Sequence, residues 1–356
     1  MKQQQVITFC LPMMPKGAVG GYKIIFELAN QLANQRYKVV LLFDVTDLYK
    51  KYHFPKLLRL LIGKRKVKKG PVWYSLETNI EKKGVLGFND YSVPKSSCVI
   101  ATAVTTAGSV AKLKQQTKKG YYIQGLETWV WPMEKVAETY RLGMKNIVIS
   151  NWLKKIVDKY ADSESILIPN ALDFSVFKLI TPIKKRNPYT IAMLYHTNEG
   201  KGTKYGLQVI EKLKNRYKNL EVTLFGIPER PEKLPNWIKY IEKASEQQLC
   251  ELYNHTAIYI SPSINEGFGL TGAESMACGC ALASFKHGGV LEYANNDNAC
   301  LSEVKNVEEM YEGIIELIEN QELRVKMAEK GYSDIKERTW SKTVQIFLNA
   351  FELNKK

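Results

Sequence analysis

Two glutamates eight positions apart, Glu266 and Glu274, mark the segment that could do the most specific chemistry. An apolar, strand-like run over residues 257–263 precedes them, and a helix-like run over residues 273–277 follows. Glycines in the turn between lack Cβ atoms, so backbone N–H groups can approach a ligand while the helix N-terminus faces an anion. A carboxylate accepts hydrogen bonds from hydroxyls. The spacing therefore suits a phosphorylated sugar.

This segment resembles the Glu-x7-Glu signature of retaining GT-B glycosyltransferases of family 4. Residues 261–263 and 288–292 resemble the usual neighbours of that signature. The resemblance implies that Glu266 binds hydroxyls of the donor sugar, that Glu274 binds the ribose of the nucleotide, and that the intervening amides meet the diphosphate. The implied donor-binding residues here are Glu266, Gly267, Phe268, Gly269, Leu270, Thr271 and Glu274. The alternative is a glycine-rich turn with two solvated glutamates, which is common in α/β folds.

A glycine pair, Gly20 and Gly21, lies between the first predicted strand and the first predicted helix. It resembles the Gly-Gly loop of the family, which approaches the donor diphosphate and the reacting sugar. A glycine pair before a helix is also a common turn, so the sequence leaves both functions open.

Residues 195–202 occupy the corresponding place in the second half of the chain. The family has an Arg about five residues before a Lys-Gly pair, and both cations neutralise the leaving diphosphate. Lys201 matches the lysine, whereas His196 stands where the arginine is expected. A neutral imidazole supplies a hydrogen bond without a fixed charge. Part of the stabilisation would then come from elsewhere or require protonation of His196. The alternative for Lys201 is a solvated loop lysine.

An aromatic-rich loop over residues 124–132 follows another predicted strand. It resembles a segment of bacterial enzymes that make surface polysaccharides, including rhamnosyltransferases. Aromatic faces beside amide and carboxylate groups suit an acceptor sugar, so Gln124, Glu127 and Trp129 are candidate acceptor-binding residues. Tryptophans also fill cores and interfaces, which is the alternative.

Short apolar runs alternate with amphipathic stretches along the whole chain, as in βα units around a parallel sheet. The 356 residues exceed one ordinary core, which predicts two Rossmann-like domains. We expect the first at residues 1–175, a linker at 176–187 and the second at 188–338. The resemblance implies the α/β GT-B fold, with parallel sheets facing across a cleft and a C-terminal helix, residues 340–356, that crosses back to the first domain.

The net charge of +15 belongs entirely to the first half, because residues 171–356 are balanced. Residues 50–69 hold nine Lys or Arg and no acid, around a leucine-rich core. Such a segment fits an anionic lipid surface, and it equally fits a solvated loop with one core-facing helix. Phosphate backbones also attract these residues, but no nucleic-acid motif accompanies them, and we expect no nucleic-acid partner.

These features predict a metal-independent sugar transferase that uses a nucleotide-diphospho-sugar and a cell-surface glycan or lipid-linked acceptor. The catalytic candidates are Glu266, Lys201 and His196, and the resemblance implies retention of configuration. No Asp-x-Asp pair follows a strand, so we expect no metal site and no cofactor. Two alternatives stay open: a polyanion-binding protein and an inactive, sugar-nucleotide-binding partner subunit.

Scattered cysteines and the lack of a leader or an 18-residue apolar run predict a cytoplasmic protein, either free or at the inner face of the plasma membrane.

Overall fold

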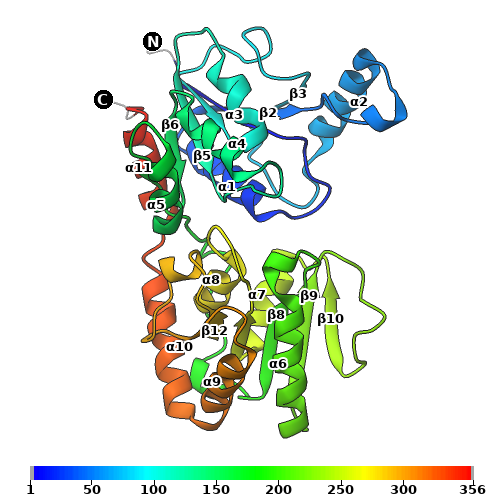
Figure 1. The fold of residues 1–356 in the computed structure, drawn as a ribbon, viewed down its shortest axis with the longest axis vertical. Helices are drawn as coiled ribbons and strands as arrows, with labels where there is room; N and C mark the ends of the chain where they lie inside the picture. Colours follow the sequence, from blue (N-terminus) through cyan, green and yellow to red (C-terminus); the bar gives the residue numbers. More distant parts are fainter. Residues whose placement is uncertain (1–3, 354–356) are drawn as a thin grey trace. The chain divides into compact units, whose positions relative to one another are not determined.

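The computed structural model describes residues 4–353. It contains two compact units, of which the first ends at Asn170 and resumes at Trp340, and the second comprises Ala171–Thr339. Each unit is built around one wholly parallel sheet (Figure 1). The prediction of two Rossmann-like α/β domains is confirmed. Residues 176–187, expected as a linker, lie within the second unit.

The first unit has a seven-stranded sheet in the order β3-β2-β1-β4-β5-β6-β7. Its strands are β1 Val6–Leu11, β2 Lys38–Asp44, β3 Glu81–Val85, β4 Cys98–Ala101, β5 Lys118–Ile123, β6 Lys145–Val148 and β7 Ile166–Leu167. Its helices are α1 Gly20–Asn34, α2 Lys56–Lys69, α3 Val104–Ala111, α4 Met133–Glu138, α5 Asn151–Tyr160 and α11 Trp340–Ala350, with 3-10 turns Lys50–Tyr52 and Thr139–Arg141. The central strands β1 and β4 are mostly apolar because helices cover both faces of a parallel sheet.

The last helix, α11, packs against the first unit although it follows the second in sequence. The Phe347 ring stacks on Phe9 of β1 with centroids 6.1 Å apart. The Tyr37 hydroxyl donates to the carbonyl of Leu353 over 2.6 Å, and the Lys118 ammonium donates to that of Phe351 over 2.9 Å. The aromatic positions of this helix are therefore core residues of the first unit.

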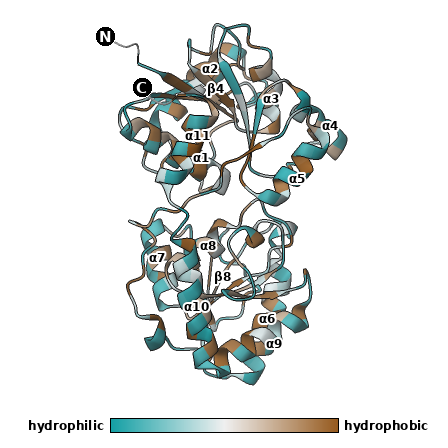
Figure 2. Ribbon diagram, turned by 90° about the vertical axis from the view of Figure 1, so that its left-hand side faces the viewer, coloured by the Kyte–Doolittle hydropathy of each residue, from teal (hydrophilic) through white to brown (hydrophobic). Residues whose placement is uncertain are grey.

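The second unit has a six-stranded sheet in the order β10-β9-β8-β11-β12-β13. Its strands are β8 Thr190–Leu194, β9 Glu221–Gly226, β10 Ile238–Glu242, β11 Ile258–Ser261, β12 Ala281–Phe285 and β13 Ala299–Ser302. Its helices are α6 Thr203–Arg216, α7 Glu246–His255, α8 Leu270–Ala277, α9 Val307–Glu319 and α10 Gln321–Ile335, with 3-10 turns Ile183–Lys185, Glu199–Lys201 and Val290–Glu292. The buried apolar residues of this unit lie on its strands and on the helices that cover them, and Figure 2 colours apolar residues brown.

Both sheets reverse their strand order next to the first strand of the unit. In the second unit β8 pairs with β9 on one side and with β11 on the other. Loops that leave such neighbouring strands at their carboxyl ends diverge, and this is where α/β sheets bind ligands. The same reversal lies between β1 and β4 in the first unit. A ligand site is therefore expected at these two carboxyl edges.

No helix within residues 4–353 is long and apolar enough to cross a lipid bilayer.

Candidate functional site

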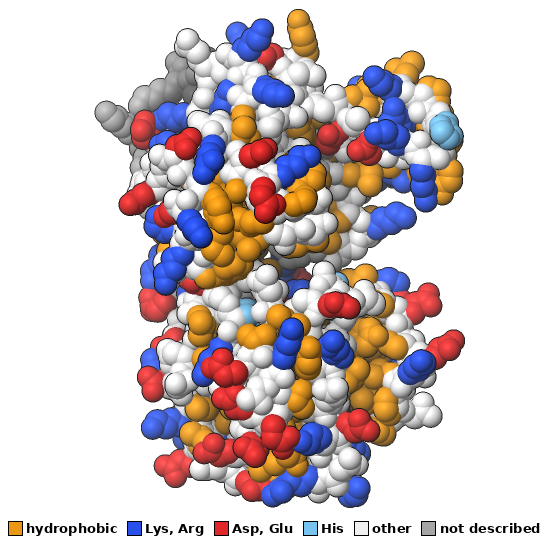
Figure 3. Space-filling model, in the orientation of Figure 1, with side chains coloured by type: hydrophobic (Ala, Val, Ile, Leu, Met, Phe, Trp, Pro, Cys, Tyr) orange, Lys and Arg blue, Asp and Glu red, His pale blue; other side chains and the backbone are white. Residues whose placement is uncertain are grey.

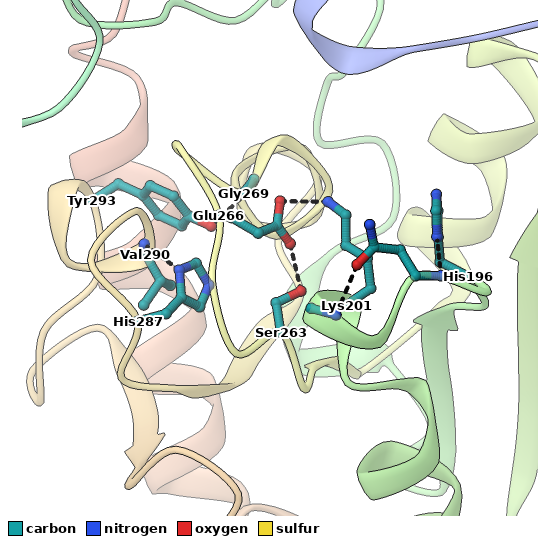
Figure 4. A network of polar contacts seen from close by, with 10 residues as sticks. His196, Lys201, Ser263, Glu266, Gly269, His287, Val290 and Tyr293 are labelled. Carbon is teal, nitrogen blue, oxygen red and sulfur yellow. Dashed lines mark hydrogen bonds and ion pairs between the residues drawn. The ribbon is translucent and has the colours of Figure 1, made fainter. Parts of the chain in front are cut away.

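Lys201 and Glu266 meet at the carboxyl edge of the second sheet. Lys201 follows β8 and Glu266 follows β11, so the strand reversal brings together residues that are 65 positions apart. The Lys201 ammonium lies 2.7 Å from Glu266 Oε2, and the Ser263 hydroxyl donates to Glu266 Oε1 (Figure 4). The Glu266 side chain is only 11% exposed and that of Lys201 29%. The arrangement is a nearly buried carboxylate held by one cation and one hydroxyl.

This environment keeps Glu266 ionised. Burial alone would raise the pKa of its carboxyl, but the charge and hydrogen bond of Lys201, together with His287 and Ser263, outweigh burial and lower the pKa. An ionised carboxylate accepts hydrogen bonds only. It can therefore hold ligand hydroxyls, and it is unsuited to donating a proton.

The local fold fixes the position of Lys201. Lys201 ends the short 3-10 turn Glu199–Lys201, which Asn198 caps by accepting a hydrogen bond from the Gly200 amide over 2.8 Å. The next residue, Gly202, has φ +64°, and a Cβ there would lie 1.8 Å from the Pro262 carbonyl oxygen. The Ile264 amide donates to the Gly200 carbonyl over 2.8 Å. The backbones of the two site loops thus touch, which only glycine at 202 allows.

Gly269 ends the Glu266 loop and is the N-cap residue of helix α8. It has φ +90°, and its carbonyl accepts a 2.8 Å hydrogen bond from the hydroxyl of Tyr293, whose ring packs 5.0 Å from that of Phe268. A Cβ at Gly289 would lie 2.6 Å from the carbonyl oxygen of Glu266, so the loop after β12 also locks against this segment. The α8 N-terminus, with its partial positive charge, therefore has a fixed place beside the Lys201–Glu266 pair.

Glu274 lies inside the unit, on α8, and is only 3% exposed. Its charge adds to burial in raising the pKa values of Tyr253 and Tyr259. The two motif glutamates therefore differ in environment: Glu266 belongs to a loop at the sheet edge, and Glu274 belongs to the buried face of the following helix.

His287, which the sequence reasoning missed, is a third member of this site. The residue is 3% exposed, and its Nδ1 accepts a 3.3 Å hydrogen bond from the Val290 amide. The proton of the neutral ring then belongs on Nε2, which is buried and has no partner among the residues that the structure describes. Burial lowers the His287 pKa to about 4, reinforced by Lys201 and opposed by Glu266. The only sequence signal is its place directly before the Gly288-Gly289 pair.

His196 occupies the position of the expected arginine and carries no charge at neutral pH. Burial and the nearby Lys201 lower its pKa, and Glu266 opposes them only in part. Its Nδ1 accepts a 2.9 Å hydrogen bond from the Asn198 amide, so the ring also shapes the loop that holds Lys201. In Figure 4, Lys201 lies between Glu266 and His196. The fixed positive charge here comes from Lys201.

In the first unit, the structure joins two loops that the sequence suggested separately. Gln124 follows β5, and its amide nitrogen donates to the Gly21 carbonyl over 3.0 Å at the start of α1. A Cβ on Gly21 would lie 3.3 Å from the same nitrogen. Gly20 is exposed at the first residue of α1. Gln124 therefore holds the glycine loop in place, a contact that was not foreseen.

Glu127 and Trp129 lie further along the same loop. Glu127 has φ +49°, and its carboxylate accepts a hydrogen bond from the amide of Val104, the first residue of α3. Burial raises the pKa of Glu127 to about 7, although the Val104 amide opposes the shift. Trp129 is 73% exposed, so it is not core filling. A separate hollow of about 370 Å³, lined by Tyr140, Lys145 and their neighbours, lies where β6 and β7 begin and contains none of these residues.

The chain is similar to known proteins in sequence and in fold. Residues 180–334 match the family model described as glycosyl transferases group 1. An uncharacterized glycosyltransferase of Methanocaldococcus jannaschii is 24% identical over 299 residues, covering 78% of this chain and 79% of that protein. Sucrose-phosphate synthase from Thermosynechococcus elongatus superposes with a TM-score of 0.76 at 12% identity. The superposition covers 99% of this chain and 100% of the synthase. HepE from Anabaena, solved with UDP and glucose, superposes with a TM-score of 0.72 at 12% identity, covering 98% and 100%.

Proposed function

We propose that this chain, a glycosyltransferase with the GT-B fold whose second unit matches group 1, moves a sugar from a nucleotide-diphospho-sugar to a glycan or lipid-linked acceptor. The observation that carries the proposal is the Lys201–Glu266 pair beside the N-terminus of α8. A cation and a helix start suit a diphosphate, while a carboxylate suits the hydroxyls of a sugar. One edge thus recognises both parts of such a donor.

In the proposed reaction, the bond between the anomeric carbon and the diphosphate oxygen breaks and leaves an oxocarbenium-like sugar. Lys201 and the α8 N-terminus stabilise the charge that develops on the departing nucleoside diphosphate. Glu266 holds sugar hydroxyls and does not attack. The acceptor hydroxyl forms the new bond on the face that the diphosphate leaves, its proton passes to the departing phosphate, and the configuration is retained.

His287 and His196 have supporting parts in this proposal. The buried Nε2 of His287 lies near Glu266 and has no acceptor within residues 4–353, so it can donate to an oxygen of the bound donor. His196 supplies shape to the Lys201 loop without a charge. Charge neutralisation by Lys201 and the helix N-terminus supports a reaction that needs no metal ion.

We assign the acceptor to the edge that contains Gln124, Glu127 and Trp129 in the first unit. An exposed tryptophan on a loop that also carries a carboxyl and an amide suits a sugar ring. The resemblance to enzymes of surface-polysaccharide synthesis supports a cell-surface glycan. The free cysteines of the described residues suit the reducing cytoplasm, where we place the reaction. A polyanion-binding protein is not favoured, because the chain matches glycosyltransferases.

The test is a screen of UDP-, GDP-, ADP- and dTDP-sugars by thermal shift and by donor hydrolysis, with EDTA present. We expect one donor class to stabilise the wild type and to be hydrolysed, and both effects to be lost in Glu266→Gln. The matched control, Glu232→Gln, changes an exposed glutamate of the same unit and should behave as wild type. Folded protein that responds to no donor would contradict the proposal, and a response that EDTA abolishes would contradict its metal independence.

A further inference from the structure

Helix α2 of the first unit presents its leucines to solvent and buries an arginine. Arg59, Gly63 and Val67 form the buried face. Leu57, Leu58 and Leu61 expose 69%, 41% and 54% of their surface. With about 3.6 residues per turn these leucines lie on the opposite side of the helix from the buried stripe. Of the two alternatives for residues 50–69, a core-facing helix therefore does not describe this leucine-bearing face, and the apolar side chains are available to a partner.

The orientation of α2 is fixed by close contacts, so the leucines cannot simply rotate inward. A Cβ on Gly63 would lie 2.7 Å from the side chain of Val45, and a Cβ on Gly84 of β3 would lie 3.1 Å from the Gly63 backbone. Arg59 donates to the carbonyl of Thr46. The helix thus touches the sheet edge with its backbone at Gly63, where no larger residue fits.

The same surface is strongly cationic. Residues 50–69 hold nine Lys or Arg and no acid, and Lys64, Arg65 and Lys68 are exposed on the turns that follow Leu61. Tyr52 adds a ring that is 57% exposed. Figure 3 shows blue and orange side chains intermingled over the α2 end of the first unit, which is also where α2 is labelled in Figure 1. Apolar and cationic side chains therefore share one face.

We propose that this face of α2, defined by Leu57, Leu58, Leu61, Lys64 and Lys68, docks on a bilayer that contains anionic phospholipid. Exposed leucines can enter the boundary between headgroups and acyl chains while neighbouring lysines meet the negative headgroups. A second copy of the chain would bring like charges together. Nucleic acid would bind the lysines through its phosphates and leave the leucines exposed to water. A bilayer with anionic lipid binds the lysines and also buries the leucines.

The experiment uses the full chain in co-sedimentation with vesicles of phosphatidylcholine, either alone or mixed with phosphatidylglycerol. We expect binding to the mixed vesicles only, weakened by salt. Lys64→Gln with Lys68→Gln should weaken the binding roughly 25-fold, at about fivefold for each cation. Leu57→Ser with Leu61→Ser should weaken it at least about tenfold through lost apolar burial. The matched controls are Lys233→Gln with Lys239→Gln, and Ile180→Ser, which change exposed residues of the second unit.

Absence of binding to the mixed vesicles, or equal binding to both vesicles, would overturn the proposal. So would a loss of binding in the control variants as large as that in the α2 variants, or a concentration-dependent dimer that Leu57→Ser with Leu61→Ser abolishes. Circular dichroism and thermal unfolding establish that each variant is folded. Donor hydrolysis measured without vesicles reports on the reaction separately, so failure of the surface and failure of the proposed reaction are distinguishable.

Discussion

The ammonium of Lys201 lies 2.7 Å from Oε2 of Glu266, and the two residues come from loops that leave adjacent strands of the second sheet. The Glu266 side chain is only 11% exposed, so its negative charge depends on the neighbouring Lys201. Lys201 supplies the largest attraction that offsets the cost of burying the Glu266 carboxylate. Donor binding would change this balance, because a diphosphate offers Lys201 a new anionic partner.

Replacing Lys201 by methionine should separate catalysis from folding. Lys201→Met removes the cation, so the pKa of Glu266 rises, and we expect donor turnover to fall about 10²–10³-fold, the usual effect of deleting one preorganised electrostatic group. Turnover is measured by release of the nucleoside diphosphate. The control Lys204→Met removes an exposed lysine of α6 and should keep wild-type turnover. Equal losses in the two variants would contradict a specific role for Lys201.

The parts of the site that directly follow apolar strands were predictable from the sequence. Glu266, the glycines after it and Lys201 follow apolar strands, and the carboxyl ends of parallel strands meet at one edge. His287 was missed because a single histidine after a strand carries no spacing signal. Its importance comes from burial beside Glu266, which is a property of the folded chain.

Most of the strands were also predictable, because buried parallel strands are continuous apolar runs. The exceptions lie at the sheet edges. The sequence of β3, with Glu81, Lys82 and Lys83, does not resemble a buried strand, yet its backbone pairs with β2. The orientation of α2 was likewise not predictable. Leucine spacing suggests a core-facing side, whereas the contact between Gly63 and Val45 decides which side faces inward.

Substitution of Gly202 tests whether the contact between the two site loops matters. Gly202→Ala places a Cβ 1.8 Å from the Pro262 carbonyl oxygen at φ +64°. We expect about 1–2 kcal/mol of destabilisation from the left-handed backbone and about 1–3 kcal/mol more from the close contact, with loss of donor turnover. Gly143→Ala is the control, because Gly143 has φ +70° with nothing within 4 Å. Urea unfolding that shows equal losses for both variants would indicate backbone strain alone.

His287 should make the second unit less stable in acid. Its pKa in the folded protein is about 4, mainly through burial, against an ordinary value of 6.5. The unfolded chain then binds more protons between these values, so stability falls as the pH drops through this window. For a single group with this shift, acidification from about pH 7 to about pH 5 should cost about 2 kcal/mol.

The measurement for His287 is urea unfolding at several pH values, with His287→Asn compared with wild type. The asparagine does not titrate, so the difference in the free energy of unfolding between the two proteins should change by about 2 kcal/mol over that range. His255→Asn changes an exposed histidine of α7 and should follow wild type. A pH-independent difference between His287→Asn and wild type would refute the assigned shift.

Glu127 should act in the opposite direction. Burial raises its pKa to about 7 from an ordinary 4.5, so the folded protein binds more protons between these values. The stabilisation is complete below about pH 4.5 and is lost as the pH rises through about 7, with a total of at most about 3 kcal/mol. Glu127→Gln is neutral throughout and its amide oxygen can still accept from Val104. The variant should therefore be more stable than wild type above pH 7, and the gain should vanish in acid.

Thermal unfolding across this pH range checks the expectation for Glu127. The control is Glu134→Gln, an exposed glutamate on the neighbouring α4, which should leave the pH dependence unchanged. Glu127 and Gln124 belong to the loop that holds Gly21, so ionisation of Glu127 should also loosen this loop. We therefore expect faster exchange of the Gly21 amide hydrogen above pH 7 in wild type. The same change should be missing in Glu127→Gln. Destabilisation of Glu127→Gln at every pH would instead mean that the carboxyl stabilises the fold in its ionised form, as a charged cap on α3.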